Sequence, residues 1–150
     1  MGTHYSGNRE DVQTLDTYIK LIRAADSLMA RIYRTSELDG LTVSQFGVLE
    51  ALLHLGPLCQ RELGEKILKS SGNITMVIDN LEKRSLVERK RDRGDRRFVT
   101  VHLTGDGDQL IRAIFPRHLD RIKNELQVLS LAEQENLGQL CRTVGRAGRE

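Results

Sequence analysis

The chain has 150 residues and a formal net charge of +2 at pH 7, and its 29% charged and 39% hydrophobic residues are typical of a globular protein. No apolar run reaches the length of a membrane-spanning helix, and the N-terminal stretch lacks the apolar core of a signal peptide. We therefore expect a cytoplasmic protein without membrane contacts, built as one domain or as two small lobes that share a core.

The N-terminal segment combines a polar stretch with a long helical pattern. Residues 1–10 are polar and contain glycine, so we expect a flexible arm there. Over residues 11–36 apolar side chains recur with helical spacing, which predicts a long amphipathic helix. The apolar positions are Leu15, Tyr18, Ile19, Ile22, Leu28 or Met29, Ile32 and Tyr33.

Three shorter helices are predicted next. Thr42 and Gln45 have the spacing of a capping box, so a helix should begin directly after Thr42 and end before Gly56. A second, short helix spans residues 60–68. The third follows the serine- and glycine-containing stretch 70–72, and its apolar residues share one face. These residues are Ile74, Val77, Ile78 and Leu81.

The third helix has a polar outer face and is followed by a predicted hairpin. The outward residues are Asn73, Thr75, Met76, Asp79, Asn80 and Lys83. The strand-like segments Leu86–Arg91 and Arg97–Leu103 meet in a turn where Gly94 can supply a positive φ. Three compact helices with an appended hairpin are typical of a winged helix-turn-helix, which we assign to residues 42–104.

Positive charge is concentrated around this hairpin. Between Lys83 and Arg97 there are eight cationic and three anionic residues, although the whole chain is close to neutral. A charge run alone is usually only a solvated surface. Beside a helix-turn-helix, a focused basic patch favours binding to double-stranded DNA.

Two more helices are predicted over residues 105–146. Pro116 should kink the first, and Ser130 with Glu133 forms a capping box for the second. The predicted fold is therefore mainly α with a small β-hairpin wing, flanked by long N- and C-terminal helices. We expect regions 11–36 and 105–146 to bury their apolar faces in a homodimer. Packing within one chain is the alternative, although two or three helices close a poor bundle.

The sequence predicts neither a cofactor nor an enzyme. The four histidines show no metal-ligand spacing with cysteines or carboxylates, so no metal site is predicted. We find no paired carboxylates in a defined site, no nucleophile beside a base and no phosphate-binding loop. The two cysteines, Cys59 and Cys141, form no disulfide framework, as expected of a reducing compartment.

Two stretches of the sequence resemble the MarR family of bacterial transcriptional regulators. The more specific one is DNLEKRSLVERKRDRGDRRFVTVHLT, residues 79–104, together with Gly107 just beyond it. The other is GEKILKSSGNITMVIDNLEKR, residues 64–84, which is similar to members that respond to phenolic, catechol or quinone compounds. In architecture the resemblance extends from about Leu15 to Val144.

The resemblance implies a homodimer that binds a pseudo-palindromic operator. Members usually act as repressors, and small ligands or thiol oxidation typically relieve the repression. The alternative is a winged-helix module for protein–protein interaction without operator binding. That alternative would favour an apolar outer face on the third helix and no basic wing, and the sequence has the reverse.

The helices are predicted to supply one set of DNA contacts: Gln60, Lys69, Ser70, Ser71, Gly72, Asn73, Thr75, Met76 and Lys83. Ser70 or Ser71 should cap the third helix, whose free N–H groups can bind a phosphate. Asn73 and Thr75 are candidates for reading base edges, and Met76 for contact with a thymine methyl group. Each of these polar residues could equally be exposed without a ligand.

The wing is predicted to supply a second set of contacts: Arg93, Asp95, Arg96 and Arg97. In the family's Asp-x-Arg pattern the carboxylate orients an arginine that enters the minor groove, and Asp95 and Arg97 match that pattern. An ordinary solvated turn is the alternative. Arg89 and Lys90 are expected to contribute to the salt dependence of binding through phosphate contacts.

The remaining predicted sites concern regulation by an effector or by oxidation. A pocket for a small aromatic effector should have Arg23, Tyr33 and His54 as polar anchors, although each can be structural. Cys59 stands where Ser or Thr would cap the short helix, a position that favours reaction with oxidants or quinones; simple packing is the alternative. Cys141 lies on an apolar helical face and is expected in the core or at the dimer interface.

Overall fold

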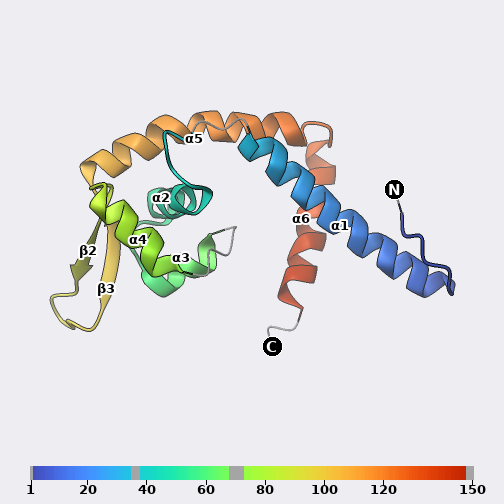
Figure 1. Cartoon of the computed structure of the whole chain (residues 1–150), viewed down its shortest axis with the longest axis horizontal. Coiled ribbons are helices and arrows are strands. Elements are labelled where there is room, and N and C mark those ends of the chain that lie inside the picture. Colours follow the sequence, from blue (N-terminus) through green and yellow to red (C-terminus); the bar gives the residue numbers. More distant parts are fainter. Residues whose placement is uncertain (1, 35–37, 68–72, 148–150) are drawn as a thin grey trace. The chain divides into compact units, whose positions relative to one another are not determined.

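The computed structural model describes residues 2–34, 38–67 and 73–147, which are mostly helical (Figure 1). They fall into two compact units, one formed by residues 1–35 with 119–150 and the other by residues 36–118. The predicted fold class, mainly α with a small sheet, is confirmed. The predicted DNA contacts Lys69, Ser70, Ser71 and Gly72 lie outside the described residues.

Three short helices make up much of the unit 36–118: α2 (Val43–Leu55), α3 (Gln60–Lys66) and α4 (Ile74–Lys83). The predicted capping box begins α2, because the Thr42 hydroxyl accepts from the Gln45 backbone N–H at 3.1 Å and the Gln45 side chain accepts from that of Thr42 at 3.0 Å. Helix α2 ends at Leu55, as predicted, and Gly56 follows with φ of 77°.

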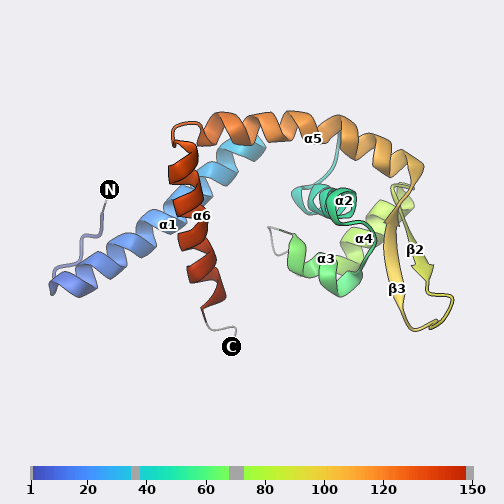
Figure 2. The same ribbon diagram turned by 180° about the vertical axis from the view of Figure 1, so that it is seen from behind.

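A three-stranded antiparallel sheet completes the winged helix. Strand β3 (Val99–Leu103) lies between β1 (Leu58–Cys59) and β2 (Val87–Arg91). Strands β2 and β3 form the predicted hairpin, which extends away from α2–α4 in both views (Figures 1 and 2). The sequence did not predict β1, because two residues are too few to display an alternating pattern.

The core of this unit lies where α2, α3, α4, the sheet and the first part of α5 (Gly105–Leu126) meet. Its largest fully buried side chains are Phe46, Val48, Leu49, Leu63, Ile78, Leu81, Val87, Val101, Ile111 and Ile114. Because α5 contributes buried side chains, the unit extends to His118, beyond the boundary at Thr104 expected from the sequence.

The start of α5 packs tightly against Leu86, which lies between α4 and β2. A Cβ atom added to Gly107 would lie 1.9 Å from the Leu86 carbonyl oxygen, a distance that no side chain can occupy. The Thr104 backbone N–H donates to the same oxygen at 3.1 Å. Glycine at position 107 is therefore a packing requirement of the fold.

The other unit consists of α1 (Arg9–Arg34), the end of α5 and α6 (Leu131–Arg146). Helix α1 begins two residues before the predicted boundary, because the Asn8 side chain accepts from the Asp11 backbone N–H at 2.8 Å. Arg31 of α1 forms a 2.6 Å ion pair with Glu125 of α5. Helix α5 continues through Pro116, and the predicted Ser130–Glu133 capping box is present before α6.

Candidate nucleic-acid interface

Helix α4 separates an apolar face from a polar one. Ile78 and Leu81 are fully buried, whereas Thr75, Met76 and Lys83 are exposed. The predicted orientation of the helix is therefore confirmed. Gln60, the first residue of α3, lies close to Thr75, and its side-chain amide donates a hydrogen bond to the Thr75 hydroxyl. Gln60 and Thr75, both predicted to contact DNA, therefore lie side by side at the N-terminal ends of α3 and α4.

Asn73 is the N-cap of α4, the role that the sequence analysis gave to Ser70 or Ser71. Its amide oxygen accepts from the Met76 backbone N–H at 3.1 Å, and helical geometry begins at Ile74. The helix therefore starts later than predicted, because asparagine satisfies an N-terminal N–H as well as serine does. One polar atom of Asn73 is occupied by this cap, and its amide N–H₂ group is the part left to contact DNA.

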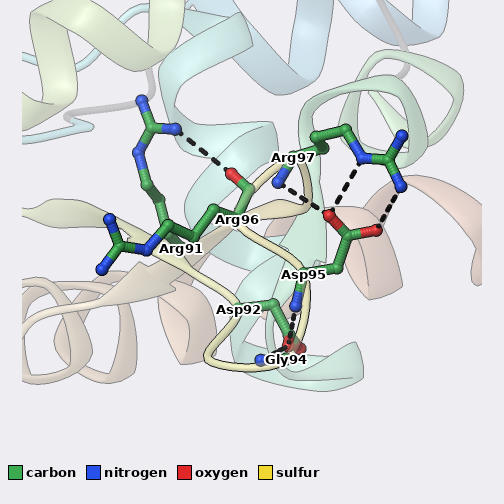
Figure 3. A network of polar contacts seen from close by, with 6 residues as sticks. All are labelled: Arg91, Asp92, Gly94, Asp95, Arg96 and Arg97. Carbon is green, nitrogen blue, oxygen red and sulfur yellow. Dashed lines mark hydrogen bonds and ion pairs between the residues drawn. The ribbon is translucent and has the colours of Figure 1, made fainter.

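The wing loop, residues 92–98, is organised by Asp92. Its carboxylate accepts from the backbone N–H groups of Gly94 at 2.6 Å and of Asp95 at 3.1 Å (Figure 3). The prediction that Gly94 supplies a positive φ is wrong, because its φ lies outside the left-handed region. An aspartate that bonds the backbone two residues ahead makes the turn instead. The Asp-x-Gly spacing was the signal in the sequence that could have indicated it.

Asp95 and Arg97 form the ion pair expected from the sequence. The Asp95 carboxylate accepts from Nε and Nη2 of Arg97 at 3.1 and 3.2 Å, and from its backbone N–H at 3.0 Å (Figure 3). The Arg97 side chain, followed by its backbone N–H, lowers the pKa of Asp95 below its usual value. The side chain of Arg97 is nevertheless 91% exposed, so the pair orients the guanidinium group without covering it.

Other arginines of the wing differ in how they are held. Arg93 and Arg96 are exposed, as predicted. The sequence analysis did not single out Arg91, which braces the loop by donating from its guanidinium to the Arg96 carbonyl oxygen at 3.1 Å (Figure 3). The side chains of Arg96 and Arg97 extend to opposite sides of the loop.

The sequence analysis expected Arg89 to contact a phosphate, but its side chain does not extend toward solvent. Its guanidinium group contacts Asp79 at 2.7 Å and Glu82 at 2.8 Å, both on α4. Sequence reasoning missed this contact, because the two carboxylates lie on a different element and looked like part of a solvated helix face. Lys90, in contrast, is exposed and pairs with Glu88 of its own strand at 3.0 Å.

One pocket in the unit 36–118 includes a predicted effector residue. It has a volume of about 340 Å³ and is lined by Leu53, His54, Arg112, Phe115 and Pro116. The rings of His54 and Phe115 meet edge to face with centroids 4.6 Å apart. The other two predicted anchors, exposed Arg23 and half-buried Tyr33, belong to α1 and do not line this pocket.

The two cysteines are in different surroundings. Cys59 is the N-cap of α3 and half buried, and its backbone N–H donates to the Glu62 carboxylate at 2.8 Å, which lowers the pKa of Glu62. Cys141 of α6 is exposed, which excludes the first of its two predicted locations, the core; the second, the dimer interface, stays a prediction. None of the side chains of α6 is buried.

The described residues contain neither a membrane-spanning helix nor a metal-ligand cluster. None of their helices is long and apolar enough to cross a membrane. Residues 2–34, 38–67 and 73–147 contain no cluster of three or more metal-ligating side chains.

Comparisons with known proteins agree with this geometry. Residues 39–97 match the sequence profile of the MarR family. The HTH-type regulators YkoM and MhqR of Bacillus subtilis are each 36% identical, over 93% and 89% of this chain and 92% of each relative. The structure of Bordetella bronchiseptica BpsR, whose DNA binding is regulated by 6-hydroxynicotinic acid, superposes with a TM-score of 0.73 at 28% identity, covering 86% of this chain and 98% of BpsR.

A helix-turn-helix with a basic wing and relatives that are transcriptional regulators define a DNA-binding transcriptional regulator of the winged-helix class. With regulators 36% identical over nine-tenths of their length, the chain belongs to the MarR family.

Proposed function

We propose that the protein is a homodimeric repressor that binds a pseudo-palindromic operator and is released by a small aromatic effector. The observation that carries the proposal is the wing loop, where Asp95 holds Arg97 in one orientation while its side chain stays 91% exposed. A preoriented guanidinium loses little conformational freedom on binding and suits the negative potential of a narrow minor groove.

In this proposal α4 occupies the adjacent major groove. Thr75 and Met76 are exposed in its first turn, with Gln60 supporting Thr75, and they are the candidates for reading bases. Asn73 keeps its amide N–H₂ group for a base or a phosphate. We further propose that Lys83 contacts the DNA backbone, as do Lys69, Ser70, Ser71 and Gly72, which lie outside the described residues.

Exposed apolar residues support the homodimer. On α1, Leu15, Tyr18 and Ile22 are each more than one-third exposed, and on α6 the side chains of Leu137, Leu140 and Val144 are exposed. Faces of this kind are typical of surfaces covered by a partner. We propose that regions 11–36 and 105–146 provide the interface, so that two copies of α4 read successive major grooves of a two-fold related operator.

The pocket lined by His54 and Arg112 supports an effector of the aromatic acid or phenol class. Its walls are apolar at Leu53, Phe115 and Pro116, and its two nitrogen-bearing side chains can bind a carboxylate or phenolic oxygen. Regulation of BpsR by 6-hydroxynicotinic acid is consistent with this class.

Thiol oxidation is a second route to release. Cys59 caps the helix that precedes α4, so a modified thiol there would disturb the DNA-binding unit. If Cys59→Ser left release by oxidants intact, this route would be excluded.

The experiment is selection of bound DNA from a genomic pool, followed by gel-shift titration of the selected operator. Arg97→Ala should weaken operator binding about tenfold or more at moderate salt, because it removes the minor-groove contact. Arg142→Ala, on the exposed polar side of α6, is the matched control. An unchanged midpoint for Arg97→Ala would contradict the proposed role of the wing, and failure to select any DNA would favour the protein–protein alternative.

The effector is tested on the same operator with hydroxylated nicotinates and benzoates, beginning with 6-hydroxynicotinic acid. A compound that releases the wild type should be about tenfold less effective on Arg112→Ala. Arg117→Ala is the control, because Arg117 lies on the same helix outside the pocket. Equal sensitivity of both variants would exclude Arg112 as the anchor.

A further inference from the structure

Arg89 is the residue of the basic wing that is turned toward the recognition helix. Its Nη2 contacts Asp79 at 2.7 Å and its Nη1 contacts Glu82 at 2.8 Å. The second oxygen of Glu82 accepts from the Arg89 backbone N–H at 3.0 Å. Side chain and main chain of the same β2 residue are therefore both bonded to α4.

This contact is partly shielded from water. The Arg89 side chain is only 25% exposed, compared with 55% for Lys90 and 91% for Arg97. Arg89 pairs in register with Val101 of β3, its cross-strand neighbour, which is fully buried. A guanidinium group in this position cannot extend to a phosphate without breaking two charge-assisted hydrogen bonds.

The chemistry of the pair also indicates a fixed geometry. Burial works against the charge on Arg89, but its hydrogen bonds to Asp79 and Glu82 outweigh burial and raise its pKa. The planar fork of arginine matches two carboxylates separated by one helical turn, whereas the single charge of lysine would not fix the direction of both. The contact therefore restrains both the distance and the angle between α4 and β2.

We propose that Arg89 is a positioning residue for DNA binding, which sets the geometry between the recognition helix and the wing. With α4 in the major groove, this geometry determines whether Arg97 reaches the minor groove. Arg89 itself makes no DNA contact, and it keeps the carboxylates of Asp79 and Glu82 bonded away from the phosphates. The inference rests on the DNA contacts proposed above for α4 and Arg97.

A double-mutant cycle on the selected operator tests it, with Arg89→Gln and Arg97→Ala alone and combined. Arg89→Gln should weaken binding about tenfold, and Arg97→Ala should then cost at least about fivefold less than in the wild-type background, since the wing is no longer held in place. Additive losses would overturn the proposal. If Arg97→Ala alone has no effect, the proposed wing contact fails instead, which separates the two ideas.

The salt dependence provides a second, independent measurement. Arg89→Gln should leave the slope of log K against log[salt] unchanged, whereas Lys90→Gln, at the exposed neighbour, should reduce it by about 1. A slope reduced by about 1 in Arg89→Gln would assign it to a phosphate and overturn the positioning role.

Two further variants control for charge and for folding. The triple variant Asp79→Asn, Glu82→Gln, Arg89→Gln should bind as weakly as Arg89→Gln; wild-type binding would show that repulsion by bare carboxylates, not geometry, caused the loss. If Arg89→Gln does not fold, Arg89→Lys keeps the charge and should still weaken binding at least about threefold with an unchanged salt slope. Wild-type affinity for Arg89→Lys would overturn the proposal.

Discussion

The two units of the chain differ in how they bury apolar side chains. Among the described residues, every fully buried apolar side chain except Ile32 lies in the unit 36–118. In the other unit, α6 has no buried residue, and Leu131 and Val128 are each 83% exposed. The DNA-binding unit therefore has a closed core of its own, whereas the outer helices keep exposed apolar side chains among the described residues.

This difference leads to opposite expectations for substitutions. In the closed unit, a change of volume should disturb folding because neighbouring atoms are already in contact. On the outer helices, the same kind of change should leave folding intact and act on association. The predictions below test this contrast, beginning with the largest expected effect.

Charge introduced on the apolar face of α6 should separate the dimer. Leu137→Glu with Leu140→Glu is expected to raise the dimer dissociation constant by about 100-fold or more, because two unpaired carboxylates would be buried at the interface. Helix content should not change, since neither side chain is buried within the chain. Sedimentation equilibrium and circular dichroism measure the two properties.

Gln139→Glu is the control for that pair, because it introduces the same charge type on the opposite side of α6. It should remain dimeric. If the double variant also remains dimeric at micromolar concentration, the outer helices are not the interface and their exposed apolar side chains need another explanation.

A pair of glycines tests packing in the two units directly. Gly107→Ala should destabilise the protein by about 2 kcal/mol or more, because the new methyl group would overlap the Leu86 carbonyl oxygen. Gly138→Ala in α6 meets no atom within 4 Å and should stabilise the protein by up to about 1 kcal/mol through helix propensity. Urea unfolding monitored by circular dichroism measures the free energy of unfolding of both variants. If both substitutions changed it in the same direction, the difference in packing between the two units would be contradicted.

Relief of backbone strain at the end of α4 should have a smaller effect. Ser85 has a φ of 56° and follows α4 in a left-handed C-terminal motif, in which the Leu86 N–H donates to the Leu81 carbonyl oxygen at 3.0 Å. Ser85→Gly should raise the free energy of unfolding by about 1 kcal/mol, because glycine adopts this conformation without a Cβ penalty. Ser85→Ala keeps the strain and should give no gain in the same urea titration.

The smallest expected effect concerns the pH dependence of the exposed wing. Because Arg97 lowers the pKa of Asp95 below the ordinary aspartate value, the ion pair should be present at neutral pH and lost as the pH falls through this lowered pKa. Titration of the Asp95 carboxyl carbon by NMR should give a midpoint below that ordinary value, which Arg97→Ala should raise. Identical midpoints in both proteins would mean that the pair does not persist in solution.

Features that depend on neighbours along the chain could be predicted from the sequence. The capping boxes at Thr42 and Ser130, the buried face of α4 and the Asp95–Arg97 pair all join residues no more than a few positions apart. The capping boxes and the buried face follow from the helical repeat, so the residue spacing alone indicates them, whereas the Asp95–Arg97 pair was expected from the resemblance to the Asp-x-Arg pattern of the MarR family. The sequence by itself thus determined the order of the helices and the hairpin of the winged helix, but not strand β1.

Other features depended on segments that only the tertiary structure brings together. The sequence predicted that Arg89 contacts a phosphate, but Asp79 and Glu82 of another element bind it. Gly107 entered only as part of the pattern shared with the MarR family, and its close packing against Leu86 is visible only in the structure. The two residues of β1 form a strand only because they pair with β3. A charged side chain binds the nearest complementary group, and folding decides which group is nearest. The sequence therefore identified the cations, whereas the tertiary structure determined which of them stay exposed, such as Arg97, and which are bound to another element, such as Arg89.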